Sequence, residues 1–220
     1  MKIFIALLLF CGVLFAGFVG MRYTNALNWY YVTTESSEPT FKAGNIVFVS
    51  RFKKPHPGSY ICYKGPGGSI YTHRCVAIAK DIIELRDGNL YRNGKFINEP
   101  YTASEYLIAN SKADSLAMYF DRAGKTLTSR DSAFSGVSLS NQELKTLHLT
   151  GLQRLVSAKG FVNEGLYKPF VKAGYNEDNF GPVTVPANSC FVLGDNRHWA
   201  MDSRYLGFIT ADMLIGTVLN

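Results

Sequence analysis

The sequence lacks the ligand patterns of a structural metal site. Its four cysteines, Cys11, Cys62, Cys75 and Cys190, form no CxxC motif and have no zinc-type Cys/His spacing, so we expect no bound metal. The last three lie in strand-like runs, where a free thiol behaves as a small hydrophobe. A disulfide stays open as an alternative, although any pairing among these three leaves one thiol free.

Charge is also sparse. Charged residues make up 18% of the chain, and 23 Lys and Arg stand against 17 Asp and Glu, a formal net charge of +6. The basic residues are scattered, so we expect no nucleic-acid partner, and mild attraction to anionic membrane lipid is the simpler reading of the charge. Internal repeats and low-complexity tracts are missing. A length of 220 residues with 47% hydrophobic content allows one core with a small second lobe.

Near the N-terminus the charge disappears altogether. The segment "KIFIALLLFCGVLFAGFVGMRY" is uncharged from Ile3 to Gly20, and 18 helical residues span roughly 27 Å, just enough for a bilayer. We therefore predict a single-pass membrane anchor over residues 1–22. A cleaved signal peptide is the alternative interpretation.

Strand patterns dominate the next part of the chain. Apolar, β-branched runs at 45–50, 59–64 and 69–79 are separated by segments rich in Pro and Gly. Asp87-Gly88 and Asn93-Gly94 then stand between alternating segments, which is a strong hairpin signal. The pattern predicts an antiparallel meander from Asn45 to Ile97.

The middle of the chain, from Tyr101 to about Ala173, is mixed and partly helical, and Ser140 with Glu143 resembles a capping box. Strand patterns then return, and we expect the last apolar run to rejoin the first sheet. The predicted fold is mainly β: an antiparallel β core with an inserted mixed α/β lobe and one N-terminal transmembrane helix. The predicted boundaries are 1–22 for the anchor, 23–81 with 183–220 for the core, and 82–182 for the lobe.

The stretch "GDNRHWAMDSRYLGFI" concentrates charge after a strand that reads as buried. It places Asp195 and Asp202 close to Arg197 and Arg204. Carboxylates held in such a network can orient a catalytic base, and the arginines can keep the carboxylates ionised. A solvated, salt-bridged turn is the alternative.

This stretch resembles the C-terminal signature of type I signal peptidases, which are membrane-anchored serine proteases. Three further pieces follow the family order: "SSEPTF" resembles the nucleophile motif Ser-Met-x-Pro-Thr, "KAGNIVFV" the strand after it, and "YTHRCVAIAKDIIELRDGNLYRNGKFI" the strand that carries the base. The matching pieces cover about half of the chain. The resemblance implies a β catalytic core, no metal and no organic cofactor.

The resemblance also implies roles for particular residues. Ser36 corresponds to the nucleophile, and Thr34 with the N–H of Ser36 could stabilise the oxyanion. His73 stands where the bacterial family has a lysine base, although relatives of the endoplasmic reticulum and of many archaea use histidine. A histidine base needs little tuning of its pKa but needs a partner for its second nitrogen. We expect that partner to be Asp202, with Asp195 as the second candidate.

The function implied is removal of signal peptides from exported preproteins by a Ser-His(-Asp) endopeptidase, with the catalytic domain on the periplasmic or extracytoplasmic side of the membrane. Two alternatives stay open. One is an inactive paralogue that binds signal peptides or acts as a scaffold. The other is a Ser-Lys peptidase in which Lys64 or Lys80 reaches Ser36. The Ser50-x-x-Lys53 spacing ends a strand instead of starting a helix, so we interpret it as chance.

Overall fold

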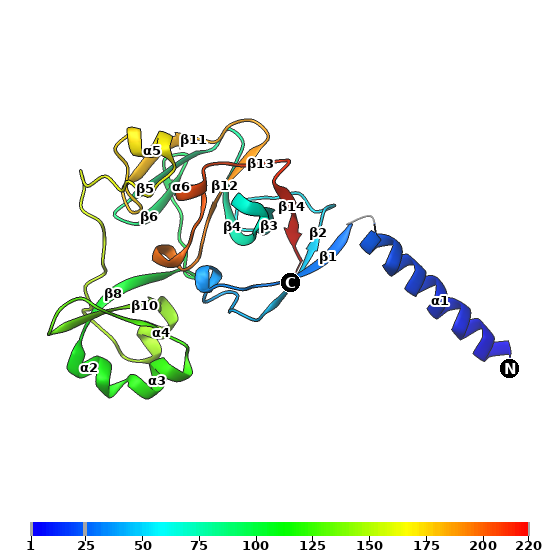
Figure 1. The fold of residues 1–220 in the computed structure, drawn as a ribbon, viewed down its shortest axis with the longest axis horizontal. Helices are drawn as coiled ribbons and strands as arrows, with labels where there is room; N and C mark the ends of the chain where they lie inside the picture. The colour runs from blue at the N-terminus through cyan, green and yellow to red at the C-terminus, as the bar shows by residue number, and fades with distance from the viewer. Residues whose placement is uncertain (1, 24–25, 220) are drawn as a thin grey trace.

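The computed structural model describes residues 2–23 and 26–219. Helix α1 (Lys2–Tyr23) extends away from a mainly β body (Figure 1). Over the described residues, no helix is both long enough and apolar enough to cross a membrane. Met1 of the predicted anchor, and residues 24–25 and 220 of the predicted core, lie outside the described residues.

A seven-stranded antiparallel sheet forms the centre of the body. Its order is β1 (Leu27–Tyr31), β2 (Ile46–Ser50), β14 (Leu214–Val218), β3 (Tyr60–Lys64), β4 (Ile70–Ile78), β12 (Ser189–Leu193) and β13 (Ile209–Thr210). The three strands expected at 45–50, 59–64 and 69–79 are confirmed within a residue. The final strand also rejoins this sheet as expected. The predicted meander from Asn45 to Ile97 is wrong in two respects. β14 lies between β2 and β3 and pairs with both, and the strands after β4 belong to a separate sheet.

The two predicted hairpin turns are confirmed in the second sheet. Its order is β11 (Phe180–Thr184), β5 (Ile82–Arg86), β6 (Asn89–Arg92) and β7 (Lys95–Phe96). Asp87 and Gly88 have φ values of 48° and 73°, and Asn93 and Gly94 have 54° and 75°. Two consecutive residues with positive φ are what a tight type I′ turn between antiparallel strands requires. The local sequence therefore fixes the register of both hairpins.

A third sheet lies to one side of the body with short helices around it (Figure 1). It has the order β8 (Ala103–Ala109), β10 (Phe134–Ser140), β9 (Leu127–Ser129), and it is accompanied by α2 (Asn110–Ser115), α3 (Ala117–Arg122) and α4 (Asn141–Thr146). The capping box at the start of α4 is present, because Ser140 Oγ accepts from the N–H of Glu143 and the Glu143 carboxylate accepts from the N–H of Ser140. We call β8–β10 with α2–α4 the side lobe. The lobe predicted over 82–182 contributes to both smaller sheets, and its boundaries stay a prediction.

The largest buried cluster joins the four-stranded sheet to strand β12. Phe170 from α5 (Lys168–Lys172), Phe180 from β11 and Phe191 from β12 pack ring against ring, and Phe170 and Phe180 have centroids 4.8 Å apart. Full burial of one such side chain stabilises a fold by about 1.5–3 kcal/mol. This packing holds the end of β12, from which the loop 194–202 leaves toward Ser36.

Candidate active site

Ser36 lies in a single 3-10 turn, η1 (Glu35–Ser37), that follows β1. Ser37, the residue after Ser36, attaches this turn to β4, because its hydroxyl donates to the backbone oxygen of Thr72 at 2.6 Å. Ser37 is fully buried, and its carbonyl also accepts from the hydroxyl of Tyr60 at 3.3 Å. Ser37 thus anchors the turn to the strand that carries His73, a role that no sequence pattern indicated.

His73 points from β4 toward Ser36 and is fully buried. Its Nε2 atom lies 3.0 Å from Ser36 Oγ, and its Nδ1 atom lies 2.8 Å from the hydroxyl of Tyr63 on β3. Burial lowers the pKa of His73 to about 4, although the negative charge of Asp202 partly offsets that effect. The imidazole is therefore neutral near pH 7, which is the form that can accept a proton.

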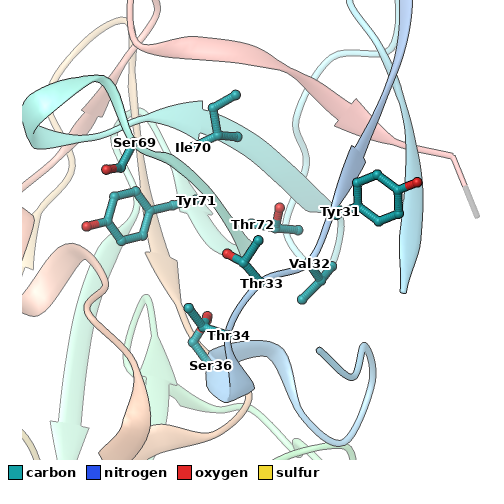
Figure 2. Close-up of a pocket in the computed structure, with 9 residues that line it drawn as sticks. All are labelled: Tyr31, Val32, Thr33, Thr34, Ser36, Ser69, Ile70, Tyr71 and Thr72. Atoms are coloured by element: carbon teal, nitrogen blue, oxygen red, sulfur yellow. The ribbon is translucent and has the colours of Figure 1, made fainter. Parts of the chain in front are cut away.

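The hydroxyl of Ser36 has a second neighbour. Thr34 Oγ1 lies 2.9 Å from Ser36 Oγ. Both side chains line a pocket of about 200 Å³ between the segment after β1 and the start of β4 (Figure 2). The other residues that line it are Tyr31, Val32, Thr33, Ser69, Ile70, Tyr71 and Thr72. The sequence-predicted residues Thr34, Ser36 and His73 are thus brought together beside an open pocket.

Asp202 is not the partner of His73, so that prediction is wrong. Its carboxylate accepts from Arg204 at 2.9 Å and 2.7 Å and from the backbone N–H of Gly194 at 3.0 Å. Burial alone would raise the pKa of Asp202, but the charge and hydrogen bonds of Arg204 bring it below its usual value. Arginine two residues along the chain forms a bidentate pair with this carboxylate, which leaves the aspartate to act on His73 only through its electric field.

Asp195, the second candidate, is occupied as well. It accepts from Arg74 at 2.9 Å and 2.7 Å, and both Thr40 and Tyr60 donate to it at 2.6 Å. Arg74 follows His73 in β4, and Thr40 follows the turn that carries Ser36. Asp195 therefore ties three separate segments together around the site without contacting the imidazole.

Arg197 and Arg204 are both buried. Each guanidinium pairs with a carboxylate and also donates hydrogen bonds to backbone carbonyls. Arg197 pairs with Glu99 at 2.5 Å and donates to the carbonyl of Gly194 at 3.2 Å. Arg204 donates to the carbonyls of Arg197 and Glu177 at 2.6 Å and 3.1 Å. The four charged residues of the predicted signature, Asp195, Arg197, Asp202 and Arg204, are thus buried and paired, unlike those of a solvated turn.

Asn196 connects the loop 194–202 to the nucleophile turn and to the side lobe. Its backbone N–H donates to the carbonyl of Ser36 at 3.1 Å, and its side-chain amide donates to the carbonyl of Glu35 at 3.2 Å. Its amide oxygen accepts from Ser138 of β10 at 2.6 Å. Sequence reasoning missed Asn196 because a loop asparagine next to charged residues has no distinguishing pattern.

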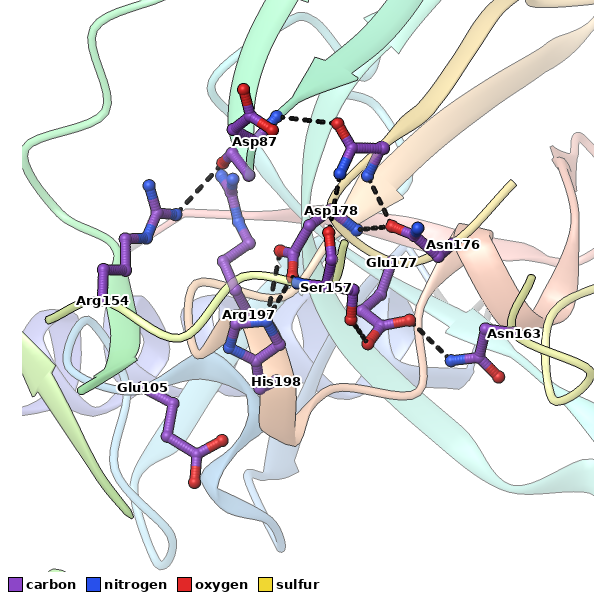
Figure 3. A network of polar contacts seen from close by, with 12 residues as sticks. Asp87, Glu105, Arg154, Ser157, Asn163, Asn176, Glu177, Asp178, Arg197 and His198 are labelled. Atoms are coloured by element: carbon purple, nitrogen blue, oxygen red, sulfur yellow. Dashed lines mark hydrogen bonds and ion pairs between the residues drawn. The ribbon is translucent and has the colours of Figure 1, made fainter. Parts of the chain in front are cut away.

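His198 lies in the loop between Gly194 and Asp202 and pairs with Asp178 and not with Ser36. Its Nε2 atom lies 3.1 Å from both carboxylate oxygens of Asp178, within a polar network that also includes Ser157 and Glu177 (Figure 3). Within residues 2–23 and 26–219, no group of three or more His, Cys, Asp or Glu residues is placed to hold a metal ion.

The lysines of the alternative mechanism do not meet Ser36. Lys64 ends β3 and Lys80 lies in the turn after β4, and both side chains are exposed. The contacts of Ser36 Oγ among the described residues are with Thr34 and His73. A serine hydroxyl against a buried, neutral imidazole beside an open pocket is the arrangement that serine hydrolases use.

Comparison with known proteins identifies the family. The family model described as "Signal peptidase, peptidase S26" matches residues 3–219. Signal peptidase I of Bacillus amyloliquefaciens is 28% identical over 196 residues, which cover 86% of this chain and 71% of that protein. Signal peptidase I V of Bacillus subtilis (strain 168) is 26% identical over 193 residues, which cover 86% of this chain and 82% of that protein. A solved signal peptidase I from Enterococcus faecalis V583 aligns with a TM-score of 0.37 and 24% identity, over 76% of this chain and 98% of that one.

The class of protein is therefore a serine endopeptidase. Because the family model covers nearly the whole sequence, the chain belongs to the signal peptidase family, peptidase S26. The resemblance drawn from the motifs is confirmed, and so is the expectation of a mainly antiparallel β fold.

Proposed function

We propose that this protein removes signal peptides from preproteins, with Ser36 as nucleophile and His73 as general base. The observation that carries the proposal is the 3.0 Å contact between Ser36 Oγ and His73 Nε2. This distance allows direct proton transfer between the two groups. Both of these relatives from Bacillus species are named as signal peptidases, which supports signal peptides as the substrate.

In the proposed reaction, Ser36 Oγ attacks the carbonyl carbon of the scissile peptide while its proton passes to His73 Nε2. The imidazolium returns that proton to the nitrogen of the leaving amine, and an acyl-enzyme forms. Water then attacks the ester as His73 accepts one of its protons, and the second product leaves with Ser36 restored. The hydroxyl of Thr34 and the N–H of Ser36 are the proposed oxyanion donors, and one such donor is commonly worth about 3 kcal/mol.

The pocket beside Ser36 is suited to an extended peptide. It is lined by residues 31–34 on one side and residues 69–72 on the other (Figure 2). Extended segments at the edge of such a pocket can pair with a substrate in strand form, while side-chain pockets select alternate residues. A preference for small side chains next to the bond that is cut is taken over from the family resemblance.

The proposal is tested by cleavage of a preprotein by the purified full chain. We expect Ser36→Ala and His73→Ala each to abolish cleavage. Ser50→Ala serves as the matched control, because Ser50 is a similarly buried serine on β2 and belongs to the Ser-x-x-Lys spacing that we interpret as chance. Cleavage that survives Ser36→Ala would overturn the mechanism, and binding of a signal peptide by a wild-type protein that never cleaves would favour the inactive paralogue.

The proposal extends to membrane attachment through α1, with the catalytic domain on the extracytoplasmic side. Described side chains of α1 such as Ile3, Leu9, Val13 and Phe15 are apolar and more than half exposed, and burial of such a surface in lipid is favourable. The sequence predicts a single-pass span, whereas no helix over residues 2–23 and 26–219 is both long and apolar enough to cross a membrane. Extraction of membranes with alkaline carbonate decides between the two, because only a spanning anchor resists it.

A further inference from the structure

The second nitrogen of His73 is where the site departs from a Ser-His-Asp arrangement. Both nearby carboxylates are committed elsewhere, Asp202 to Arg204 and Asp195 to Arg74. The atom 2.8 Å from His73 Nδ1 is the phenolic oxygen of Tyr63. We infer that Tyr63 is the residue that positions His73 and sets the tautomer needed for catalysis, and this inference rests on the proposed function.

Tyr63 is held in a fixed position. Its side chain is fully buried on β3, and its ring stacks on Tyr71 with centroids 5.6 Å apart and an interplanar angle of 16°. The register of β3 and β4 pairs Tyr63 with Tyr71 and Ile61 with His73, so the tyrosine and the histidine are diagonal neighbours on one face of the sheet. The hydroxyl therefore reaches the ring of His73 from a rigid element.

The chemistry of the phenol differs from that of a carboxylate. Burial and the nearby charge of Asp202 raise the pKa of Tyr63, so the hydroxyl keeps its proton. A neutral phenol can either accept a hydrogen bond or donate one, whereas a carboxylate only accepts. The hydroxyl of Tyr63 can therefore be the acceptor that a proton on His73 Nδ1 requires.

Four groups form one hydrogen-bonded chain: Thr34, Ser36, His73 and Tyr63. In the reactive array, Ser36 donates its proton to a bare Nε2, and Nδ1–H donates to the oxygen of Tyr63. In the opposite array, Tyr63 donates to Nδ1, Nε2–H donates to Ser36 Oγ, and the imidazole has no free lone pair for the serine proton. Catalysis requires the first array, in which Tyr63 is the acceptor.

Loss of the hydroxyl should therefore act on chemistry more than on substrate binding. In Tyr63→Phe, a proton on Nδ1 would be a buried donor with no acceptor, and such groups are rare because they are costly. The ring then favours Nε2–H, which cannot accept the proton of Ser36. Stabilisation of the imidazolium formed during the reaction is lost as well.

The fields that reach His73 from other elements stay in place in this variant. They come from Asp202, Asp195 and Arg204. A change in the titration of His73 would then report the missing hydroxyl and not a change in neighbouring charge.

The test compares full-chain wild type, Tyr63→Phe and Tyr60→Phe. The control removes a buried hydroxyl from the same strand, but that hydroxyl contacts Asp195 and the carbonyl of Ser37 and not His73. For Tyr63→Phe we expect kcat to fall by about 10²-fold, within the range for loss of general base function, with KM changed less than about twofold because no pocket residue is altered. We expect the acid limb of kcat/KM to move to lower pH in Tyr63→Phe and to stay in place in Tyr60→Phe.

A second measurement does not depend on activity or on the folding of a variant. Nitrogen-15 NMR of wild type labelled at histidine shows which ring nitrogen of His73 carries the proton. A significant population with Nδ1–H supports the inference, even if the wild type cleaves nothing and the proposed function fails. Nε2–H alone, or a Tyr63→Phe variant with wild-type kcat and acid limb, would overturn the inference and leave Tyr63 as a packing residue.

Discussion

The carboxylate of Asp195 holds the guanidinium of Arg74 through two hydrogen bonds, of 2.9 Å to Nε and 2.7 Å to an Nη nitrogen. The guanidinium also lies 3.7 Å from the centroid of the Tyr101 ring. The aspartate is 1% exposed at its side chain, so water does not replace a lost partner.

Asp195→Asn should therefore destabilise the fold strongly. It removes the charge that compensates Arg74, and an uncompensated buried charge costs about 3–5 kcal/mol. The change is measured as a lower free energy of unfolding in urea. The matched control is Glu84→Gln, which breaks a bidentate pair of similar geometry with Arg86 on the surface, where we expect little measurable change. Equal effects of the two variants would contradict the assignment of Asp195 as the link between three segments.

The dependence of activity on pH should reflect the burial of His73. Its pKa is lowered to about 4 by burial, so the neutral, proton-accepting form persists well below pH 6. We expect kcat/KM to stay high through pH 5 and to fall as the pH drops through about 4, instead of falling through pH 6–7 as an unperturbed histidine would. His56→Gln is the control, because His56 is exposed and should leave the limb unchanged. If kcat/KM of the wild type instead falls near pH 6.5, then neighbouring groups stabilise the His73 imidazolium enough to cancel the effect of burial on its pKa.

The same burial should make stability depend on pH. The unfolded chain binds a proton at His73 below about pH 6.5, while the folded chain stays neutral at this position down to about pH 4. The contribution of His73 to stability is thus fully present above pH 6.5 and is lost as the pH falls toward 4. Urea unfolding of wild type and His73→Phe at pH 7 and pH 5 checks the sign, since the variant should lose less stability over this interval. An equal loss in both proteins would contradict a neutral buried ring.

Asn196→Ala should weaken catalysis through the position of the nucleophile turn. The amide holds the carbonyl of Glu35 and accepts from Ser138, and small displacements of a reacting group are costly. We expect kcat to fall by about tenfold or more with little change in KM. Asn98→Ala, at an exposed asparagine, is the control. Full activity of Asn196→Ala would show that the hydrogen bond from the backbone N–H of residue 196 to the carbonyl of Ser36 is enough to position the nucleophile turn.

Gly194→Ala should act on the same turn by crowding. An added Cβ would lie 2.7 Å from the carbonyl oxygen of Ser36 and would overlap the Cβ of Ala200, and neither atom belongs to a flexible side chain. Overpacking of this kind costs about 1–3 kcal/mol, so we expect a lower melting temperature together with a lower kcat. Gly12→Ala, where nothing lies within 4 Å, should leave both unchanged. A fully active Gly194→Ala protein would mean that the turn carrying Ser36 can shift without a loss of catalytic activity.

Features specified by neighbouring residues were predictable from the sequence. The turns at Asp87-Gly88 and Asn93-Gly94 depend on two residues with positive φ, and the cap of α4 depends on Ser140 and Glu143. Each needs only local backbone chemistry. The insertion of β14 between β2 and β3 depends on contacts over more than 150 residues, and no local pattern specifies it.

The site was predictable only in part. The positions of Ser36 and His73 came from motif order. The prediction of a carboxylate partner for His73 failed because arginines hold both Asp202 and Asp195, and motif order does not show these pairs. Tyr63 was missed because a tyrosine in a strand usually reads as core. Pairing the two runs around the Pro/Gly-rich turn 65–68 would have placed it diagonal to His73, so the signal was present in the hairpin register.

The placement of β14 has a consequence for the time at which this peptidase can first act. Residues 214–218 fill the gap between β2 and β3, and those two strands flank the segments that present the nucleophile and the base. A ribosome-bound chain that still holds these residues in the exit tunnel cannot assemble the sheet. A newly made copy therefore cannot hold Ser36 and His73 in this sheet until residues 214–218 have left the exit tunnel.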